Sequence, residues 1–329
     1  MIRLRFSVVI PLYNKRAYIR RAVDSVLAQT HREFELIVVD DGSTDGSHEA
    51  LASVADQRCT LVRQQNAGAG AARNRGAGEA RERWVSFLDA DDFWLPEHLA
   101  ETSRLIQAFP GCGFVATGFR EVPEAEADRV RLDAGRRSNL RAVDYLLEAS
   151  REIGRVNSSN VTIRRASLLA VGGFGPFPAG EDLDCWARLA LREKAALSDR
   201  LTAIYVRGTG GVMQQLEELQ PTIPNVSARR LEDISPSVAS LCRAIEAEPA
   251  LARRRGLHAY LNARVFSCVY GSLYRLDVPE ARNYAKLLNP PYGVTISAFR
   301  LLLLLPPAWL TIALRAARNL NDTGKSLHG

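Results

Sequence analysis

The chain has 329 residues, of which 47% are hydrophobic and 24% are charged, and its formal net charge is +6. This length and composition suit a globular protein with a large core and argue against a disordered or low-complexity chain. The five widely spaced cysteines include no CxxC pair or Cys/His cluster, which argues against a disulfide framework or a structural zinc site and favours a reducing compartment.

The first 117 residues alternate between strand and helix signals. Short apolar runs bounded by turn residues predict buried strands, and apolar residues at helical spacing predict amphipathic helices. The expected strands are Phe6–Ile10, Phe34–Val39, Thr60–Arg63, Trp84–Leu88 and Cys112–Thr117. The expected helices are 16–28, Ser47–Ala55, Ala71–Ala80 and Pro96–Ala108. This alternation predicts an α/β fold with a largely parallel central sheet, which binds ligands at the carboxyl ends of its strands.

The rest of the chain is less regular at first and then helical. Residues 121–138 are charged and aperiodic, which predicts a loop. The mixed segment that follows contains one expected helix and two expected strands, at 142–148, 161–163 and 201–206. After Gly211 the pattern is wholly helical. We therefore expect an α/β half at 1–118, a second, mixed half at 119–210 and a helical C-terminal region at 211–329.

Two adjacent carboxylates, Asp40 and Asp41, directly follow the predicted strand 34–39. At the end of a strand they can accept hydrogen bonds from N–H or hydroxyl groups of a ligand. The next residues, Ser43, Thr44 and Asp45, are typical helix N-caps. We expect both: Asp40 and Asp41 face a ligand, and the three residues after them cap the next helix.

A run of small residues follows the predicted strand 60–63, in the segment Gln65–Gly76. Small residues allow a ligand to approach the backbone, and a helix N-terminus offers free N–H groups to anions. Arg73 and Arg75 add positive charge. The segment has neither the full dinucleotide-binding fingerprint nor the lysine of a Walker A loop, so a tight strand-to-helix turn with solvated arginines is the alternative.

Three carboxylates, Asp89, Asp91 and Asp92, follow the predicted strand 84–88. Such a cluster usually needs a cation or a polyhydroxyl ligand to offset the mutual repulsion, and hard divalent ions prefer oxygen ligands. The alternative is an acidic turn before the helix that begins at Pro96. A fourth acidic segment, Gly180–Leu189, places its acids in the first turn of a predicted helix, where they can interact with the helix dipole or act as a general base.

Together these segments resemble the family 2 glycosyltransferases of GT-A fold. They follow that family's order over about Phe6–Arg207 and comprise Ser7–Asn14, Asp40–Gly46, Asn66–Asn74, Leu88–Asp92 and Glu181–Leu189. The resemblance implies an inverting, metal-dependent transferase that uses a nucleotide sugar. It makes 1–118 the nucleotide-sugar-binding half and 119–210 the acceptor-side half with the catalytic base. The Gln-x-x-Arg-Trp motif of similar processive synthases is absent, which favours addition of one sugar per encounter.

The resemblance also implies roles for five residues on the donor side. Pro11 and Tyr13 would line the pocket for the base. Asp40 would contact the base, and Asp41 would lie nearby. Arg73 would lie near the ribose and the phosphates of the nucleotide.

Four further residues would surround the reacting groups. The resemblance places Asp89 near the ribose or metal and makes Asp91 the ligand of Mg²⁺ or Mn²⁺ on the diphosphate. Asp182 would be the catalytic base, supported by Glu181.

The choice of Asp182 over Asp184 follows from helical geometry. Residues two apart on a helix point about 200° apart, so the two carboxylates cannot face one site. Arg188, at i+4 from Asp184, is a ready ion-pair partner that would make Asp184 a weaker base. Trp186 takes the same position relative to Asp182 and favours a more basic carboxylate.

The implied substrates are a UDP- or dTDP-sugar, with a GDP-sugar open, and a glycan or lipid-linked acceptor in the synthesis of surface polysaccharides or glycoconjugates. Nucleic acid is not expected as a partner. One alternative is a nucleotidyltransferase, which also uses a glycine-rich loop and metal-binding aspartates. The other is a catalytically silent protein that binds nucleotide sugars or acts as a scaffold.

An uncharged run, Leu301–Leu314, lies near the C-terminus between Arg300 and Arg315. It is shorter than the roughly 20 residues of a membrane span, and Pro306-Pro307 interrupts it. Its flanks favour a helix lying at the membrane surface, while packing against the enzyme or against a second copy is open. We expect a cytoplasmic protein, peripheral on the cytoplasmic face of the inner membrane if this run binds lipid.

Overall fold

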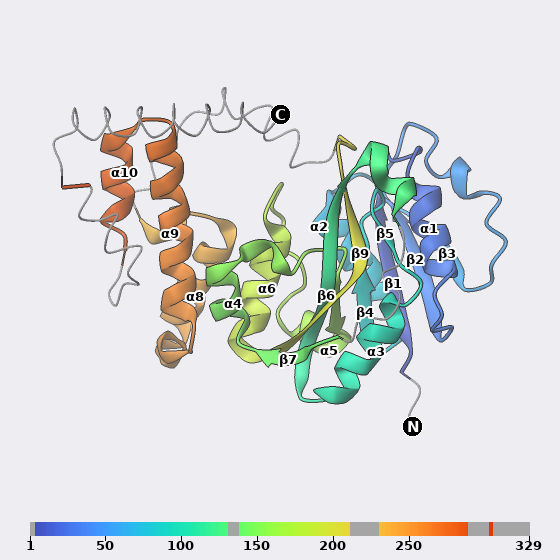
Figure 1. Ribbon diagram of the computed structural model, residues 1–329, viewed down its shortest axis with the longest axis horizontal. Coiled ribbons are helices and arrows are strands. Elements are labelled where there is room, and N and C mark those ends of the chain that lie inside the picture. The colour runs from blue at the N-terminus through green and yellow to red at the C-terminus, as the bar shows by residue number, and fades with distance from the viewer. Residues whose placement is uncertain (1–3, 131–137, 211–229, 289–302, 305–329) are drawn as a thin grey trace. The chain divides into compact units, whose positions relative to one another are not determined.

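A computed structural model of the chain describes residues 4–130, 138–210, 230–288 and 303–304. The chain forms two compact units (Figure 1). Met1–Tyr145 and Glu152–Ile223 make the first unit, and Leu146–Arg151 and Pro224–Gly329 make the second. The three-part division expected from the sequence stays a prediction.

The first unit is built on one nine-stranded sheet. Its strands are β1 (Phe6–Leu12), β2 (Phe34–Asp40), β3 (Cys59–Arg63), β4 (Trp84–Phe87), β5 (Phe93–Trp94), β6 (Cys112–Pro123), β7 (Leu140–Val143), β8 (Val161–Arg164) and β9 (Lys194–Arg207). Their order is β3-β2-β1-β4-β8-β6-β9-β5, with β7 also beside β9. The half from β3 to β4 is parallel throughout. Beyond it β8 is antiparallel to both neighbours, β6 and β9 are parallel, and β5 and β7 run antiparallel to β9.

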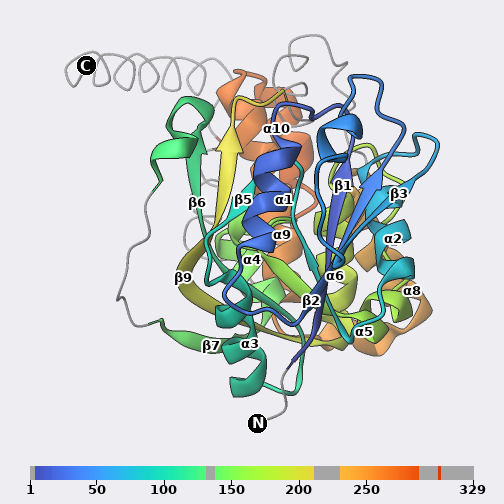
Figure 2. The same cartoon turned by 90° about the vertical axis from the view of Figure 1, so that its right-hand side faces the viewer.

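Helices cover both faces of this sheet, as the α/β pattern predicts. They are α1 (Ile19–Leu27), α2 (Ala69–Glu79), α3 (His98–Ala108), α5 (Arg165–Ala170) and α6 (Glu181–Arg192). Figures 1 and 2 show α1 and α3 on one side and α6 on the other. The apolar residues of α1 and α3 share a core with alternate residues of β1, namely Phe6, Val8, Ile10 and Leu12.

Alternation along β1 sends Val9 to the opposite face, where it contacts α2. Phe87, which pairs with Val9 across the sheet, begins an aromatic stack on that face. Its ring lies 5.2 Å from that of Phe174, and Phe174 lies 5.5 Å from Trp186 of α6. Thus α2 and α6 pack on the same side of the parallel half, next to the ends of β1 and β4.

The structure corrects two expected elements. Ser47–Ala55 is not a full helix and contains only the 3₁₀ turn η1 (Glu49–Leu51), because the polar side chains before it hydrogen-bond to another loop. The expected loop at 121–138 begins as strand, since β6 continues to Pro123 beside β9 and is followed by the 3₁₀ helix η2 (Glu124–Arg129).

The second unit is helical in its described part, as predicted. It contains α8 (Pro236–Ala247), α9 (Leu257–Tyr274) and α10 (Val278–Ala285), the 3₁₀ turns η4 (Leu231–Asp233) and η5 (Pro249–Arg253), and most of α4 (Tyr145–Arg151). Its core joins apolar residues of α9 and α10 to Leu288 and Leu303. Most of the apolar run Leu301–Leu314 lies outside the described residues, but Leu303 is buried and Leu304 is 78% exposed. None of the described helices is long and apolar enough to cross a membrane.

Candidate active site

The loop after β1 is fixed by hydrogen bonds to the loop after β2. Asn14 adopts a left-handed backbone with φ of 50°. Its N–H donates to Ser43 Oγ at 3.1 Å, and its side-chain oxygen accepts from the N–H of Thr44 at 2.8 Å. The N–H of Lys15 donates to Ser47 Oγ at 2.9 Å. The position of Lys15 at the end of β1 is therefore set by its backbone.

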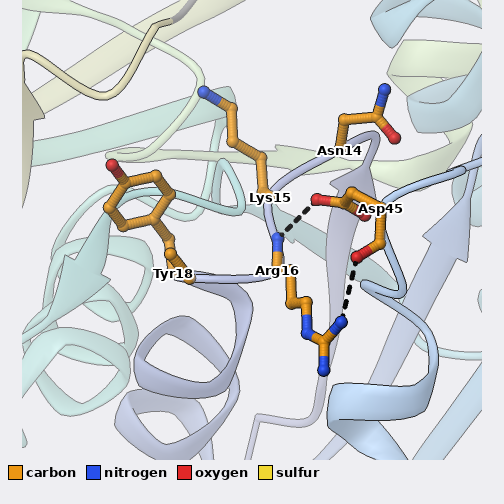
Figure 3. Close-up of a pocket in the computed structure, with 6 residues that line it drawn as sticks. Asn14, Lys15, Arg16, Tyr18 and Asp45 are labelled. Atoms are coloured by element: carbon orange, nitrogen blue, oxygen red, sulfur yellow. Dashed lines mark hydrogen bonds between the residues drawn. The ribbon is translucent and has the colours of Figure 1, made fainter.

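The predicted capping role of Ser43, Thr44 and Asp45 is wrong. The residue before η1, His48, makes no side-chain cap, and Asp45 instead accepts the N–H of Arg16 at 3.0 Å. The Asp40–Gly46 segment thus serves to hold the neighbouring loop. A hollow of about 530 Å³ borders this junction and is lined by Asn14, Lys15, Arg16, Ala17, Tyr18 and Asp45 (Figure 3).

Asp40 and Asp41 are both buried, and protein groups already satisfy them. Asp40 accepts a hydrogen bond from the N–H of Ser43 at 2.9 Å and another from Arg63 Nε at 3.0 Å. Arg63 is exposed, so this pair lies at the edge of the site where a ligand could compete for it. The predicted contact of Asp40 with a base stays a prediction. The predicted contacts of Pro11 and Tyr13 with the base also stay predictions, and the exposed fraction of Tyr13 is 48%.

Asp41 organises the turn that leads into α2. Its carboxylate accepts the N–H groups of Ala67 and Gly68 at 2.9 and 2.8 Å, and the side chain of Gln64 at 2.8 Å. Gly68 has φ of 91°, a conformation that favours glycine. Asp41 therefore fixes the turn immediately before α2.

Arg73 joins three of the segments that the sequence singled out. Its Nη2 donates to Asp89 Oδ1 at 2.7 Å and its Nη1 donates to Glu181 Oε1 at 2.8 Å. The guanidinium is 4% exposed and lies 5.4 Å from the ring centre of Phe174. Burial disfavours its charge, but the two carboxylates outweigh burial and raise the pKa of Arg73. Arg73 thus links the end of β4 to the start of α6.

The loop before α6 is locked to α2 by Asn74. Its side chain donates to the carbonyl of Phe174 at 2.9 Å and accepts the N–H of Phe174 at 2.8 Å. A Cβ on Gly70 would lie 3.1 Å from the carbonyl oxygen of Gly175 and 3.2 Å from Cγ of Glu181. The small residues of this segment therefore allow α2 to approach the acidic turn of α6.

Asp91 is ion-paired with Lys15. Lys15 Nζ lies 2.8 Å from Asp91 Oδ2 and also donates to the carbonyl of Thr209 at 2.9 Å. The hydroxyl of Thr209 donates to the same Asp91 oxygen at 2.7 Å. Both charged side chains are largely buried, at 15% exposed for Lys15 and 16% for Asp91.

Asp92 has a structural position. It is 1% exposed, accepts the N–H of Val206 at 2.8 Å and is hydrogen-bonded to the hydroxyl of Ser159. Burial, with the neighbouring charges of Asp91 and Asp89, raises its pKa well above the ordinary range. Asp92 thereby ties the end of β4 to β9, and only its two acidic neighbours reach the site.

The two aspartates of α6 have different surroundings. Asp184 is 1% exposed and pairs with Arg188 at 2.6 Å, as the i+4 spacing predicts. Asp182 is only partly buried, and its carboxylate accepts a hydrogen bond from the N–H of Leu183 at 2.6 Å. Burial, together with the charge of Glu181, raises the pKa of Asp182 to about 6. The carboxylate of Asp182 is thus more basic than that of an ordinary aspartate, whereas Asp184 is held within the helix packing.

The donor set of Asp89 and Asp91 fits a divalent ion that arrives with a phosphate ligand. Among the described residues, Asp89 Oδ2 and Asp91 Oδ1 receive no hydrogen bond. No group of three or more His, Cys, Asp and Glu side chains in the described ranges could hold a metal ion alone. Mg²⁺ is commonly held by one or two carboxylates together with substrate phosphates, so two carboxylate oxygens suffice.

Sequence reasoning missed Lys15, Thr209, Ser159 and Phe174. Lys15 is one of only four lysines and directly follows the first motif, which is a signal that could have been used. The other three lie in segments without a motif. Strand pairing brings Ser159 and Thr209 to the site, because β8 lies beside β4 and β9 lies beside β5. Hydrogen bonds to Asn74 hold Phe174 there.

Comparison with known families agrees with this arrangement of motifs. The model of the family described as Glycosyl transferase family 2 matches residues 7–168. This segment belongs to glycosyl transferase family 2. The family 2 segment includes Asp40, Arg73, Asp89 and Asp91, while Asp182 follows it in the same structural unit.

Three relatives show how far the likeness extends. An uncharacterized glycosyltransferase of Nostoc sp. is 41% identical over 109 residues, or 32% of this chain and 33% of that protein. The putative teichuronic acid biosynthesis glycosyltransferase TuaG of Bacillus subtilis is 40% identical over 116 residues, 34% of this chain and 46% of TuaG. The succinoglycan biosynthesis protein ExoW of Rhizobium meliloti is 40% identical over 111 residues, 32% of this chain and 35% of ExoW. Each match spans less than half of the relative.

Solved structures establish the fold of the chain. TarS 1–349 of S. aureus, in complex with UDP-GlcNAc, superposes with a TM-score of 0.66 at 19% identity, covering 98% of this chain and 92% of TarS 1–349. The mannosyltransferase PcManGT of Pyrobaculum calidifontis, in complex with GDP-Man and Mn²⁺, gives a TM-score of 0.56 at 20% identity over 98% and 88% of the two chains. The predicted GT-A fold is confirmed.

Proposed function

We propose that this chain is an inverting glycosyltransferase in which Asp182 is the general base. The observation that carries the proposal is the partly buried carboxylate of Asp182, whose pKa is raised to about 6, beside the Asp89–Arg73–Glu181 ion pairs. A carboxylate of this pKa is ionised at neutral pH and is more basic than an ordinary aspartate, as a base acting on a hydroxyl needs to be.

The reaction follows from that assignment. An acceptor hydroxyl gives its proton to Asp182 while its oxygen forms a bond to the anomeric carbon of the donor. The bond from that carbon to the nucleoside diphosphate breaks on the opposite face, so the anomeric configuration inverts. Glu181, held by Arg73 at 2.8 Å, keeps a negative charge beside Asp182 that favours uptake of the proton.

Asp89 and Asp91 would hold a divalent ion, Mg²⁺ or Mn²⁺, at the end of β4. When bound, such an ion supplies positive charge to the departing diphosphate. The chain's own contribution is to fix the two carboxylates. Arg73 orients Asp89 through one hydrogen bond, and Lys15 and Thr209 orient Asp91 through two.

The substrates are inferred by likeness. TarS and PcManGT were solved with UDP-GlcNAc and GDP-Man, and TuaG and ExoW are named for the synthesis of surface polysaccharides. We expect a UDP- or dTDP-sugar as donor, with a GDP-sugar as the alternative, and a glycan or lipid-linked acceptor. The C-terminal run Leu301–Leu314 with its arginine flanks supports peripheral attachment to the cytoplasmic face of the membrane.

The decisive experiment uses the full chain with Mn²⁺ and a panel of nucleotide sugars. A donor that binds raises the unfolding temperature, and slow donor hydrolysis should release a nucleoside diphosphate and a sugar of inverted configuration, read by NMR. Release of pyrophosphate would select a nucleotidyltransferase. Donor binding with no hydrolysis, and with no transfer to any glycan or lipid-linked acceptor, would select the silent binding protein.

The metal assignment has its own test. Asp91→Asn should abolish the Mn²⁺-dependent part of donor binding, measured by calorimetry, and leave the unfolding temperature close to that of the wild type. Full activity of the wild type in excess EDTA would contradict the metal dependence while leaving the role of Asp182 intact.

A further inference from the structure

We propose that Lys15 occupies the cation position at Asp91 in the free enzyme and passes to the donor diphosphate when metal and donor bind together. Metal and nucleotide would then enter as a pair, because the metal alone must compete with the lysine. The identity of the diphosphate rests on the proposed function, but the competition between Lys15 and a metal ion does not.

The first support is the geometry of the ammonium group. Lys15 Nζ contacts Asp91 Oδ2 at 2.8 Å and the carbonyl of Thr209 at 2.9 Å. An ammonium has three N–H donors, and the described residues accept two of them. The remaining donor is available to a further acceptor without loss of the first two contacts.

The second support is that this lysine is placed by its backbone. The N–H of Lys15 is bonded to Ser47, and the preceding residue, Asn14, is in a left-handed conformation bonded to Thr44. Figure 3 shows the side chains of Lys15 and Arg16 leaving this turn in different directions, with Arg16 toward Asp45. The turn thus selects which of two adjacent cations reaches Asp91.

The third support is electrostatic. Lys15 and Asp91 are 15% and 16% exposed, so water screens their charges only in part. Arg21 adds a second positive group, since its Nη2 donates to the backbone carbonyl of Asp91 at 3.3 Å. A divalent ion that approaches Asp91 alone therefore meets two nearby cations. When the metal arrives bound to a nucleoside diphosphate, the phosphates bring negative charge. A phosphate oxygen can then accept a hydrogen bond from the ammonium of Lys15.

The test is the affinity of the free chain for Mn²⁺, measured by electron paramagnetic resonance without nucleotide. Lys15→Gln should bind Mn²⁺ about tenfold more tightly than the wild type, because a charge that competes for the same carboxylate is gone. With saturating Mn²⁺, the same variant should bind UDP or GDP several-fold more weakly. Lys15→Arg should keep the low Mn²⁺ affinity, and Arg16→Gln, which removes the adjacent cation, should match the wild type.

Equal or weaker Mn²⁺ binding by Lys15→Gln would overturn the proposal, as would wild-type Mn²⁺ affinity that is the same with and without nucleotide. The double variant Lys15→Gln/Asp91→Asn should lose the gain in Mn²⁺ affinity. If it kept that gain, the metal would bind elsewhere, and the proposal would also be overturned. If Lys15→Gln unfolds, Lys15→Met is measured in its place with the same expectation. Because the Mn²⁺ measurement needs no turnover, failure of the proposed sugar transfer would be seen separately.

Discussion

Asp182 and Asp184 lie two positions apart on α6, yet only Asp182 is partly exposed. Asp184 is 1% exposed and its Oδ2 is bonded to Arg188, which also donates to the carbonyl of Gly173 at 2.7 Å. That ion pair fastens α6 to the loop before it. Asp182 is left with a single short contact to its own helix and with a more basic carboxylate.

The two acids should therefore respond differently to the same substitution. Asp182→Asn should lower kcat by about 100-fold or more, as expected for loss of a general base, and leave donor affinity nearly unchanged. Asp184→Asn should mainly lower the free energy of unfolding, by about 3 kcal/mol, because it leaves Arg188 without its buried partner. Steady-state kinetics and denaturant unfolding of both variants measure this, and the reverse pattern would assign the base to Asp184.

The pH dependence of the rate and of the stability should both report the ionisation of Asp182. Since Asp182 acts in its ionised form and its pKa is about 6, kcat/KM should rise as pH increases through 6 and level off above it. The free energy of unfolding should instead fall as pH rises through the same range. The raised pKa means that the folded chain holds a proton that the unfolded chain has released between pH 4 and 6, so ionised Asp182 costs stability above that window.

Asp182→Asn should consequently unfold at a higher temperature than the wild type at pH 8, with the gain lost at pH 4. Kinetics and thermal unfolding across pH 4 to 8 check both effects. A flat rate profile, or a variant less stable than the wild type at pH 8, would contradict the assignment.

At the scale of elements, the sequence predicted the parts whose signals are local. Apolar strands that end in acids placed Asp40 and Asp89 correctly at strand ends. The sequence could not show that Asp92 bonds to β9 or that Thr209 bonds to Asp91, because those contacts depend on the pairing of distant strands. The failed helix at 47–55 has the same cause, since its polar residues bond to the loop after β1.

The packing of α2 on β1 depends on the absence of a single side chain. A Cβ on Gly76 would lie 2.3 Å from Cγ1 of Val9, whereas one on Gly78 would meet nothing within 4 Å. Gly76→Ala should lower the free energy of unfolding by about 1–3 kcal/mol through overpacking. It should also weaken donor binding, because α2 carries Arg73.

Gly78→Ala is the matched control on the same helix. It should be neutral or stabilise by up to about 1 kcal/mol, because alanine favours a helix over glycine. Denaturant unfolding of the pair gives the comparison, and equal effects of the two substitutions would show that α2 does not press on β1 as described.

At the scale of the whole molecule, the chain combines an α/β unit with a helical unit that has its own core. The two described residues of the apolar run Leu301–Leu314 differ in exposure. Leu303 packs in the helical core, where its carbonyl accepts Arg282 Nε at 3.0 Å, and Leu304 is 78% exposed. A side chain buried in the helical core and an exposed apolar side chain therefore occupy neighbouring positions of this run.

Removal of the chain after Pro290 should move the protein from the membrane fraction to the supernatant. Leu304→Glu should lower binding to anionic vesicles without a change in unfolding temperature, because the side chain is exposed in the free protein. Leu303→Glu should lower the unfolding temperature. Vesicle sedimentation and thermal unfolding distinguish the two, and unchanged vesicle binding of both Leu304→Glu and the truncated chain would contradict membrane docking.

Selection for heat tolerance and selection for turnover should favour different side chains at Arg73 and its two partners. Buried ion pairs such as those to Asp89 and Glu181 carry a desolvation cost, and apolar replacements of similar volume often recover about 1–4 kcal/mol. A library selected only for survival at high temperature should enrich joint apolar substitutions at these three positions and lose sugar transfer. A library selected for transfer should retain the three residues or change all three together. Positions that are far apart in the chain should therefore vary together.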